Sequence, residues 1–169
     1  MKRPAAPLLL LLIAAACVLA GCVSDGPSEP RKPRIPPQPR DARADVVLLN
    51  LAPPTDSDGD TAPDTFVASV HLFDERHQLP VRVDGTLRVD LLRSRQEEPI
   101  QSWTLSPSEL RARVVQAQVG PVYRIRLEVP RQRGPILDRV VDIRCTFTGG
   151  SGQDSVAWHR GLTWSGRAP

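Results

Sequence analysis

The chain has few of the residues that carry nucleophilic or metal chemistry, with three cysteines and three histidines among 169 residues. His71 and His77 stand six residues apart, which is not the i, i+4 spacing of a helical zinc pair. The sequence also contains no H-E-x-x-H motif, no G-x-S-x-G elbow and no phosphate-binding glycine loop. These absences favour a binding or assembly protein over an enzyme.

The charge shows no excess of one sign that would point to nucleic acid. Lys and Arg number 22 against 19 Asp and Glu, which gives a formal net charge of +3. Arginines alternate with acidic residues along most segments, whereas a nucleic-acid binder concentrates basic charge on one face. We therefore expect no nucleic-acid partner.

The N-terminal residues have the three zones of an export signal. Lys2 and Arg3 precede an apolar run from Leu8 to Leu19, which is too short to span a bilayer comfortably. The run closes with Leu19-Ala20-Gly21-Cys22, which resembles the lipobox of bacterial lipoproteins. The resemblance implies a signal peptide over residues 1–21 and a mature N-terminus at Cys22, acylated with chains such as palmitate and inserted in the lipid bilayer. An ordinary signal peptide with an incidental cysteine is the alternative.

The residues after Cys22 bear on the choice of membrane. Val23 and Ser24 follow, so no aspartate stands in the second position. In the best-known lipoprotein sorting rule, aspartate there retains the protein at the inner membrane. The resemblance therefore implies the outer membrane. Two or more acyl chains would anchor the protein stably, where a single chain binds only marginally.

Only one cysteine remains once the signal is removed and Cys22 is acylated. Cys145 lies in the alternating run of Val141, Ile143 and Phe147. No intramolecular disulfide can form in such a mature chain. The alternation predicts that Cys145 is a buried and inert thiol.

Residues 22–44 form a proline-rich segment. Prolines stand at positions 27, 30, 33, 36, 37 and 39, among charged residues and almost no large apolar side chains. Such a segment buries too little surface to fold and favours extended polyproline II structure. We interpret it as a tether, followed by a folded domain over residues 45–169.

The domain sequence alternates between apolar and polar residues, with turn residues between the runs. In the run from 122 to 129, Tyr123, Ile125 and Leu127 alternate with charged residues. This period of two is typical of half-buried antiparallel strands. Expected strands cover 46–51, 65–73, 85–93, 100–105, 122–129, 140–147 and 155–164. The fold class predicted is all-β: an antiparallel two-sheet sandwich, immunoglobulin-like or transthyretin-like, with one short connecting helix.

The connecting helix is predicted after Ser106. Ser106-Pro107-Ser108-Glu109 combines a serine N-cap, a proline at N1 and a glutamate at N3, which is a capping box. We expect two or three turns with Leu110, Val114 and Val115 facing the sheet, ending before Gly120.

One acidic loop is a candidate metal site. Asp56, Asp58, Asp60 and Asp64 can converge on a hard cation such as calcium. The D-x-D-G-D-x-x-P-D pattern resembles a single thrombospondin type 3 calcium repeat. It departs from an EF-hand at Thr61, where glycine belongs, and at Val67, where the bidentate glutamate belongs. The alternative is a solvated hairpin loop whose residues simply suit turns.

The function expected is that of an envelope lipoprotein with a non-enzymatic binding or assembly sandwich, whose partner is an envelope protein or a polysaccharide. Type VI secretion lipoproteins offer one alternative, since they pair a lipobox with a transthyretin-like sandwich, and the run Phe66 to Phe73 resembles one of their strands. A carbohydrate-binding or hydrolase accessory domain is the other. It requires Trp103, Trp158 and Trp164 to form an exposed platform, whereas such residues more often fill a core.

Overall fold

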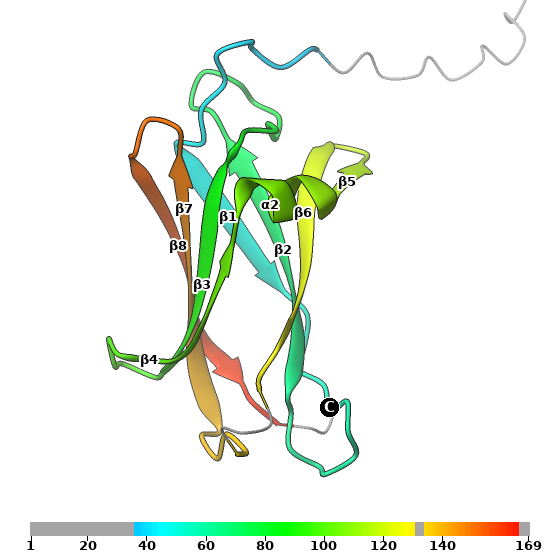
Figure 1. Ribbon diagram of the computed structural model, residues 1–169, viewed down its shortest axis with the longest axis vertical. Coiled ribbons are helices and arrows are strands. Elements are labelled where there is room, and N and C mark those ends of the chain that lie inside the picture. The colour runs from blue at the N-terminus through cyan, green and yellow to red at the C-terminus, as the bar shows by residue number, and fades with distance from the viewer. Residues whose placement is uncertain (1–35, 131–133, 166–169) are drawn as a thin grey trace, which may run out of the picture. The chain divides into compact units, whose positions relative to one another are not determined.

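The computed structural model describes residues 36–130 and 134–165, and the signal peptide and Cys22 lie outside these residues. In the described part, strands and one short helix follow one another along the chain (Figure 1). None of the described helices has the length and apolarity needed to cross a membrane. The strands are β1 (Val46–Leu51), β2 (Thr65–Phe73), β3 (Gly85–Arg93), β4 (Pro99–Leu105), β5 (Val114–Ala117), β6 (Gly120–Glu128), β7 (Val140–Gly149) and β8 (Asp154–Thr163).

The strands form two four-stranded antiparallel sheets. The first has the order β1-β2-β6-β5 and the second the order β4-β3-β7-β8. With strands named A, B, C, C′, D, E, F and G along the chain, these orders are ABED and C′CFG, those of an immunoglobulin-like sandwich with a C′ strand. The predicted all-β two-sheet sandwich is confirmed. The sequence left open an immunoglobulin-like or a transthyretin-like sandwich, and the strand order is the immunoglobulin-like one.

The core lies between the sheets and follows from the alternation in the sequence. Phe66, Ala68, Val70 and Leu72 all point from β2 into the core, because successive side chains of a strand face opposite sides. Burial of each large apolar side chain contributes about 1.5–3 kcal/mol before the entropy cost of ordering it. The facing strands supply Tyr123, Ile125 and Leu127 from β6, Leu87, Val89 and Leu91 from β3, and Ile143, Cys145 and Phe147 from β7.

The helix is shorter than predicted, and a strand follows it. Helix α2 (Pro107–Ala112) begins with the predicted capping box at Ser106 and buries Leu110. It ends after six residues, and β5 then pairs with β6 through Val114 and Tyr123. The expected two- or three-turn helix reaching Val114 and Val115 is wrong. Adjacent β-branched valines favour a strand, and the edge of β6 offers unpaired backbone groups that β5 satisfies.

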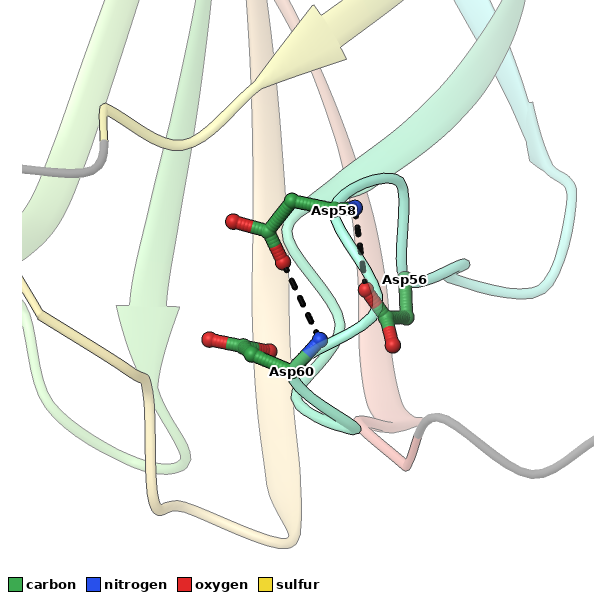
Figure 2. A group of neighbouring side chains, drawn as sticks. All are labelled: Asp56, Asp58 and Asp60. Atoms are coloured by element: carbon green, nitrogen blue, oxygen red, sulfur yellow. Dashed lines mark hydrogen bonds between the residues drawn. The ribbon is translucent and has the colours of Figure 1, made fainter.

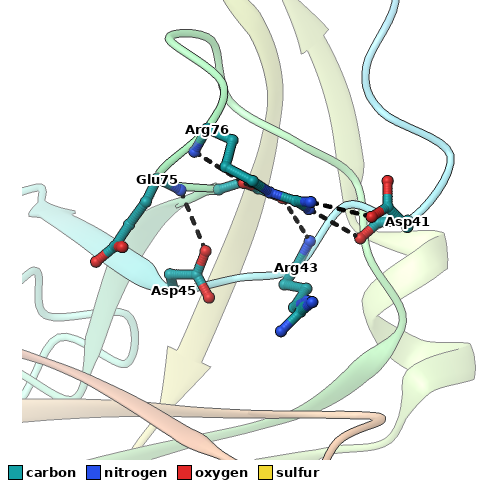
Figure 3. Close-up of polar contacts among 6 residues, drawn as sticks. Asp41, Arg43, Asp45, Glu75 and Arg76 are labelled. Atoms are coloured by element: carbon teal, nitrogen blue, oxygen red, sulfur yellow. Dashed lines mark hydrogen bonds and ion pairs between the residues drawn. The ribbon is translucent and has the colours of Figure 1, made fainter.

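The described end of the proline-rich segment is bound to the sandwich through residues 38–45, here called the strap. Figure 3 shows the contacts that Asp41, Arg43 and Asp45 make with the start of the β2–β3 connection. The Gln38 side-chain amide donates to the Arg82 carbonyl at 2.9 Å and accepts from the Arg82 N–H at 2.8 Å. The Arg43 N–H donates to the buried Asp74, and the Arg76 guanidinium bonds both Asp74 and Asp41. The composition of residues 38–44 predicts that they belong to the tether. In the structure they bond to the sandwich, so the folded domain begins before the predicted boundary at Asp45.

Candidate functional site

The acidic loop connects β1 and β2 and gathers three of its carboxylates. Asp56, Asp58 and Asp60 each offer an oxygen such that these atoms all lie within 4.8 Å of one another (Figure 2). Asp58 and Asp60 are exposed, and Asp56 is half-buried. Oxygen ligands at this spacing suit a hard cation. The cluster could therefore hold a metal ion.

Asp56 also organises the backbone of the loop. Its carboxylate accepts hydrogen bonds from the N–H groups of Gly59 at 2.7 Å, Thr61 at 2.8 Å and Asp58 at 3.1 Å. The bonds from Gly59 and Thr61 lower the pKa of Asp56, so its carboxylate is ionised at neutral pH. This arrangement suits a metal-binding loop, and it equally suits a turn stabilised by aspartate alone.

Thr61 has the backbone conformation of a glycine. Its φ is +74°, in the left-handed region that β-branched residues avoid at a cost of about 1–2 kcal/mol. Position six of a calcium loop is where an EF-hand places its glycine for a sharp turn. The loop therefore makes that turn despite the substitution, with the Thr61 N–H held by Asp56.

Asp64 does not join the group of three. Its carboxylate accepts from the Ser57 N–H at 2.9 Å and from the Ser57 hydroxyl at 2.7 Å, which closes the base of the loop. Burial would raise the pKa of Asp64, but these hydrogen bonds outweigh it and the pKa is lowered. Asp58, Asp60 and Asp64 do line one cavity of about 150 Å³ with Pro130 and Gly134. Of the four predicted ligands, the structure thus gathers three and places the fourth beside them.

Two of the three tryptophans belong to the core. Trp103 and Trp164 meet the Phe66 ring edge to face, with centroids 5.6 and 5.8 Å away. Trp164 is 3% exposed, and Trp103 is half-buried and donates from Nε1 to the Glu128 carbonyl. Only Trp158 is exposed, at 41% of its surface. The tryptophans therefore do not form a shared exposed platform.

Trp158 lies on the outer face of the second sheet between two arginines. Arg144 on β7 is the cross-strand partner of Trp158, and the Arg144 guanidinium lies 5.4 Å from the centroid of the Trp158 ring. The Arg160 guanidinium lies 4.9 Å from the same ring. Together with Arg95, Glu97 and Asp142, these three residues line a cavity of about 380 Å³. We call Arg144, Trp158 and Arg160 the Trp158 cluster.

A buried carboxylate fixes one arginine of the Trp158 cluster. Asp90, 1% exposed, accepts from Arg144 at 2.8 and 2.9 Å, from Arg88 at 2.8 Å and from the Ser102 hydroxyl at 2.6 Å. Burial alone would raise the pKa of Asp90, but the hydrogen bonds from Ser102, Arg88 and Arg144 lower it. The carboxylate is therefore ionised at neutral pH. This cluster was not predicted from the sequence. The feature that could have indicated it is the spacing of Trp158 and Arg160, which are two residues apart and therefore lie on the same face of the strand.

Cys145 and His71 pack against other residues of the sandwich and do not form a site. Cys145 is fully buried, which confirms the predicted burial, and burial raises the pKa of its thiol to about 12. His71 is half-buried and stacks on Phe73, and burial lowers the pKa of the imidazole.

Comparison with known proteins adds no relative. No protein-family model matches the chain, and no curated protein or solved structure matches it.

Proposed function

We propose that this protein is an outer-membrane lipoprotein whose sandwich binds or assembles with an envelope partner without catalysing a reaction. The observation that supports binding is the Trp158 cluster, an exposed indole between two guanidinium groups in a fold whose other two tryptophans pack against the core. Tryptophan and arginine are the residues most enriched at binding hot spots. The buried Asp90 holds Arg144 in place, which reduces the entropy lost when a partner binds.

The charge of this face favours an acidic partner. Glu97 lines the same cavity, but among the described residues no carboxylate forms an ion pair with Arg95 or Arg160. Asp142 instead accepts the backbone N–H groups of Arg95 and Gly161. Two guanidinium groups are thus free to meet carboxylates on an envelope protein.

A photo-crosslinking residue placed at Val156 tests this face in intact cells. Val156 is exposed two residues before Trp158 on the same side of β8. We expect a specific covalent protein adduct, lost in the Trp158→Ala background, because truncating a hot-spot tryptophan weakens binding about 30-fold or more. The same crosslinker at Arg124, exposed on the other sheet, is the control. Identical adducts from positions 156 and 124 would refute the binding face, and a polysaccharide adduct would favour the carbohydrate-binding alternative.

The lipid anchor is tested by labelling the cells with an alkyne analogue of palmitate. We expect the wild-type chain to carry the label and Cys22→Ser to lose it, because only the lipobox cysteine receives the acyl chains. Cys17→Ser is the matched control and should keep the label. Label that persists in Cys22→Ser would show that the acyl chains are attached elsewhere, and an unlabelled wild type would remove the anchor.

We further propose that the ion held by Asp56, Asp58 and Asp60 is calcium with a structural role. Oxygen ligands disfavour zinc and copper, and magnesium usually keeps more of its water. If only the folded state binds, a hundredfold excess over the dissociation constant adds about 2.7 kcal/mol of stability. Thermal melts with calcium and with chelator should therefore differ for the wild type and coincide for Asp58→Ala. Coincident wild-type melts at millimolar calcium would leave the solvated turn as the explanation.

A further inference from the structure

A second concentration of arginines lies where the strap joins the sandwich. A cavity of about 460 Å³ is lined by Arg40 and Arg43 of the strap, by Arg82 of the β2–β3 connection, and by the glycines at the end of β7 and the start of the β7–β8 turn. Asp45 and Asp84 line it as well. All three arginines are exposed. The cavity is therefore open to a ligand that approaches from solvent. We call it the strap pocket.

The strap pocket carries positive charge that the described residues leave unpaired. No described carboxylate forms an ion pair with the Arg40, Arg43 or Arg82 guanidinium groups. Asp45 and Asp84, which also line the pocket, and Asp41 beside it are held by other groups. Asp41 pairs with Arg76 at 3.0 Å, Asp84 pairs with Arg111 at 3.0 Å, and Asp45 accepts the Glu75 N–H at 3.1 Å. Three guanidinium groups around one cavity are a suitable site for a phosphate-bearing ligand.

The backbone of the strap fixes this arrangement. Gln38 bonds both backbone groups of Arg82, and the Arg43 N–H is held by Asp74. Arg76 hydrogen bonds lower the pKa of Asp74 strongly, so this clamp stays ionised at neutral pH. The Ser155 hydroxyl also donates to the Ala44 carbonyl at 2.5 Å. The three arginine side chains thus project from backbone that is already ordered, which lowers the entropy cost of binding an anion.

The position of the strap pocket along the chain suggests the source of that anion. The chain has 14 residue steps from Cys22 to Pro36, which span at most about 50 Å. If Cys22 is acylated, the strap is the part of the folded domain that is tied most closely to the bilayer. Basic side chains near an anionic lipid surface each strengthen binding roughly fivefold.

We propose that the strap pocket binds the phosphodiester headgroup of an anionic phospholipid and holds this end of the sandwich against the membrane. This inference rests on the proposed lipid anchor, because the anchor keeps the strap pocket beside the bilayer in the cell. The anchor alone would leave the domain free to rotate. Headgroup binding would orient it, with the Trp158 cluster presented on a fixed side.

Vesicle flotation with an unacylated mature chain, residues 22–169 carrying Cys22→Ser, tests the pocket separately from the anchor. At low ionic strength we expect binding to vesicles that contain phosphatidylglycerol and none to pure phosphatidylcholine. Changing Arg40, Arg43 and Arg82 together to glutamine should weaken the partition roughly a hundredfold. The matched control changes Arg113, Arg124 and Arg139 to glutamine, which gives the same net charge from exposed side chains elsewhere.

The outcomes separate the two proposals. Equal losses in both triple variants would mean diffuse electrostatics and would overturn the strap pocket, as would absent flotation of the unacylated chain with all of its arginines in place. Saturable binding of glycerol phosphate without vesicle binding would assign the pocket to a soluble anion and overturn the membrane role. If the chain binds vesicles but is not labelled by the palmitate analogue in cells, the proposed lipid anchor is wrong and headgroup binding is still supported.

Discussion

Asp90→Ala is expected to lower the free energy of unfolding by about 3 kcal/mol, because it leaves the arginines of a buried carboxylate without their partner. Arg144, with 26% of its side chain exposed, loses both of its hydrogen bonds, and the Ser102 hydroxyl loses its acceptor. The expected loss is at the low end of the range for breaking a buried ion pair, because the Arg88 side chain is half-exposed and water can solvate it in the variant. Urea unfolding followed by circular dichroism measures the change.

The control for this variant is an exposed ion pair of the same kind. Glu128 pairs with Arg126 at 3.1 Å on the surface of β6, so Glu128→Ala should cost less than about 1 kcal/mol. Similar losses in the two variants would contradict the special role of the buried carboxylate. Asp90→Asn should fall between them, because it keeps one acceptor oxygen and removes the charge.

The Asp90 network also predicts a pH dependence. The folded-state pKa of Asp90 lies below its unfolded value, so its stabilisation is complete above the unfolded pKa, about 3.9. That stabilisation is lost as the pH falls through the folded-state pKa. The difference in stability between wild type and Asp90→Ala should thus be constant near neutral pH and shrink progressively below about pH 4. A difference that grew in acid would contradict the ionised state of Asp90.

The sandwich could be predicted because strand period and burial are local properties of the sequence. The alternation places every second residue of the runs Phe66 to Leu72 and Tyr123 to Leu127 in the core. Each of these alternate residues is buried in the structure. Strand β5 was missed because two valines after a capped helix can also continue that helix, although β-branched residues favour a strand. Only the free edge of β6, which is a tertiary feature, decides between them.

The sites depend on contacts between residues far apart in the chain, and these could not be predicted. The Trp158 cluster requires the register that sets Arg144 beside Trp158, and a register shift between Val141 and Ile143 contributes to it. The strap requires Gln38 to meet Arg82, 44 residues away. The acidic loop was visible because its aspartates lie within nine residues, although the separate role of Asp64 depends on how the loop closes on Ser57.

Gly85→Ala is expected to destabilise the sandwich by about 3 kcal/mol, because the first residue of β3 has no room for a side chain. A Cβ there would lie 2.5 Å from the Thr148 carbonyl oxygen and closer still to the Phe147 ring. Neither neighbour can move easily: the carbonyl belongs to β7, which pairs with β3 from Gly85 to Arg93, and Phe147 is buried in the core. The melting temperature should fall by about 10 °C for a domain of this size.

Gly150→Ala is the matched control, since it makes the same substitution in the adjacent β7–β8 turn. A Cβ at Gly150 would meet nothing within 4 Å, and its φ lies outside the left-handed region. We expect a melting temperature equal to that of the wild type or slightly higher, because alanine restricts the unfolded chain more than glycine does. If both variants melted like the wild type, Phe147 would have to turn away from Gly85, and the close packing of β3 against β7 at this end of the core would be wrong.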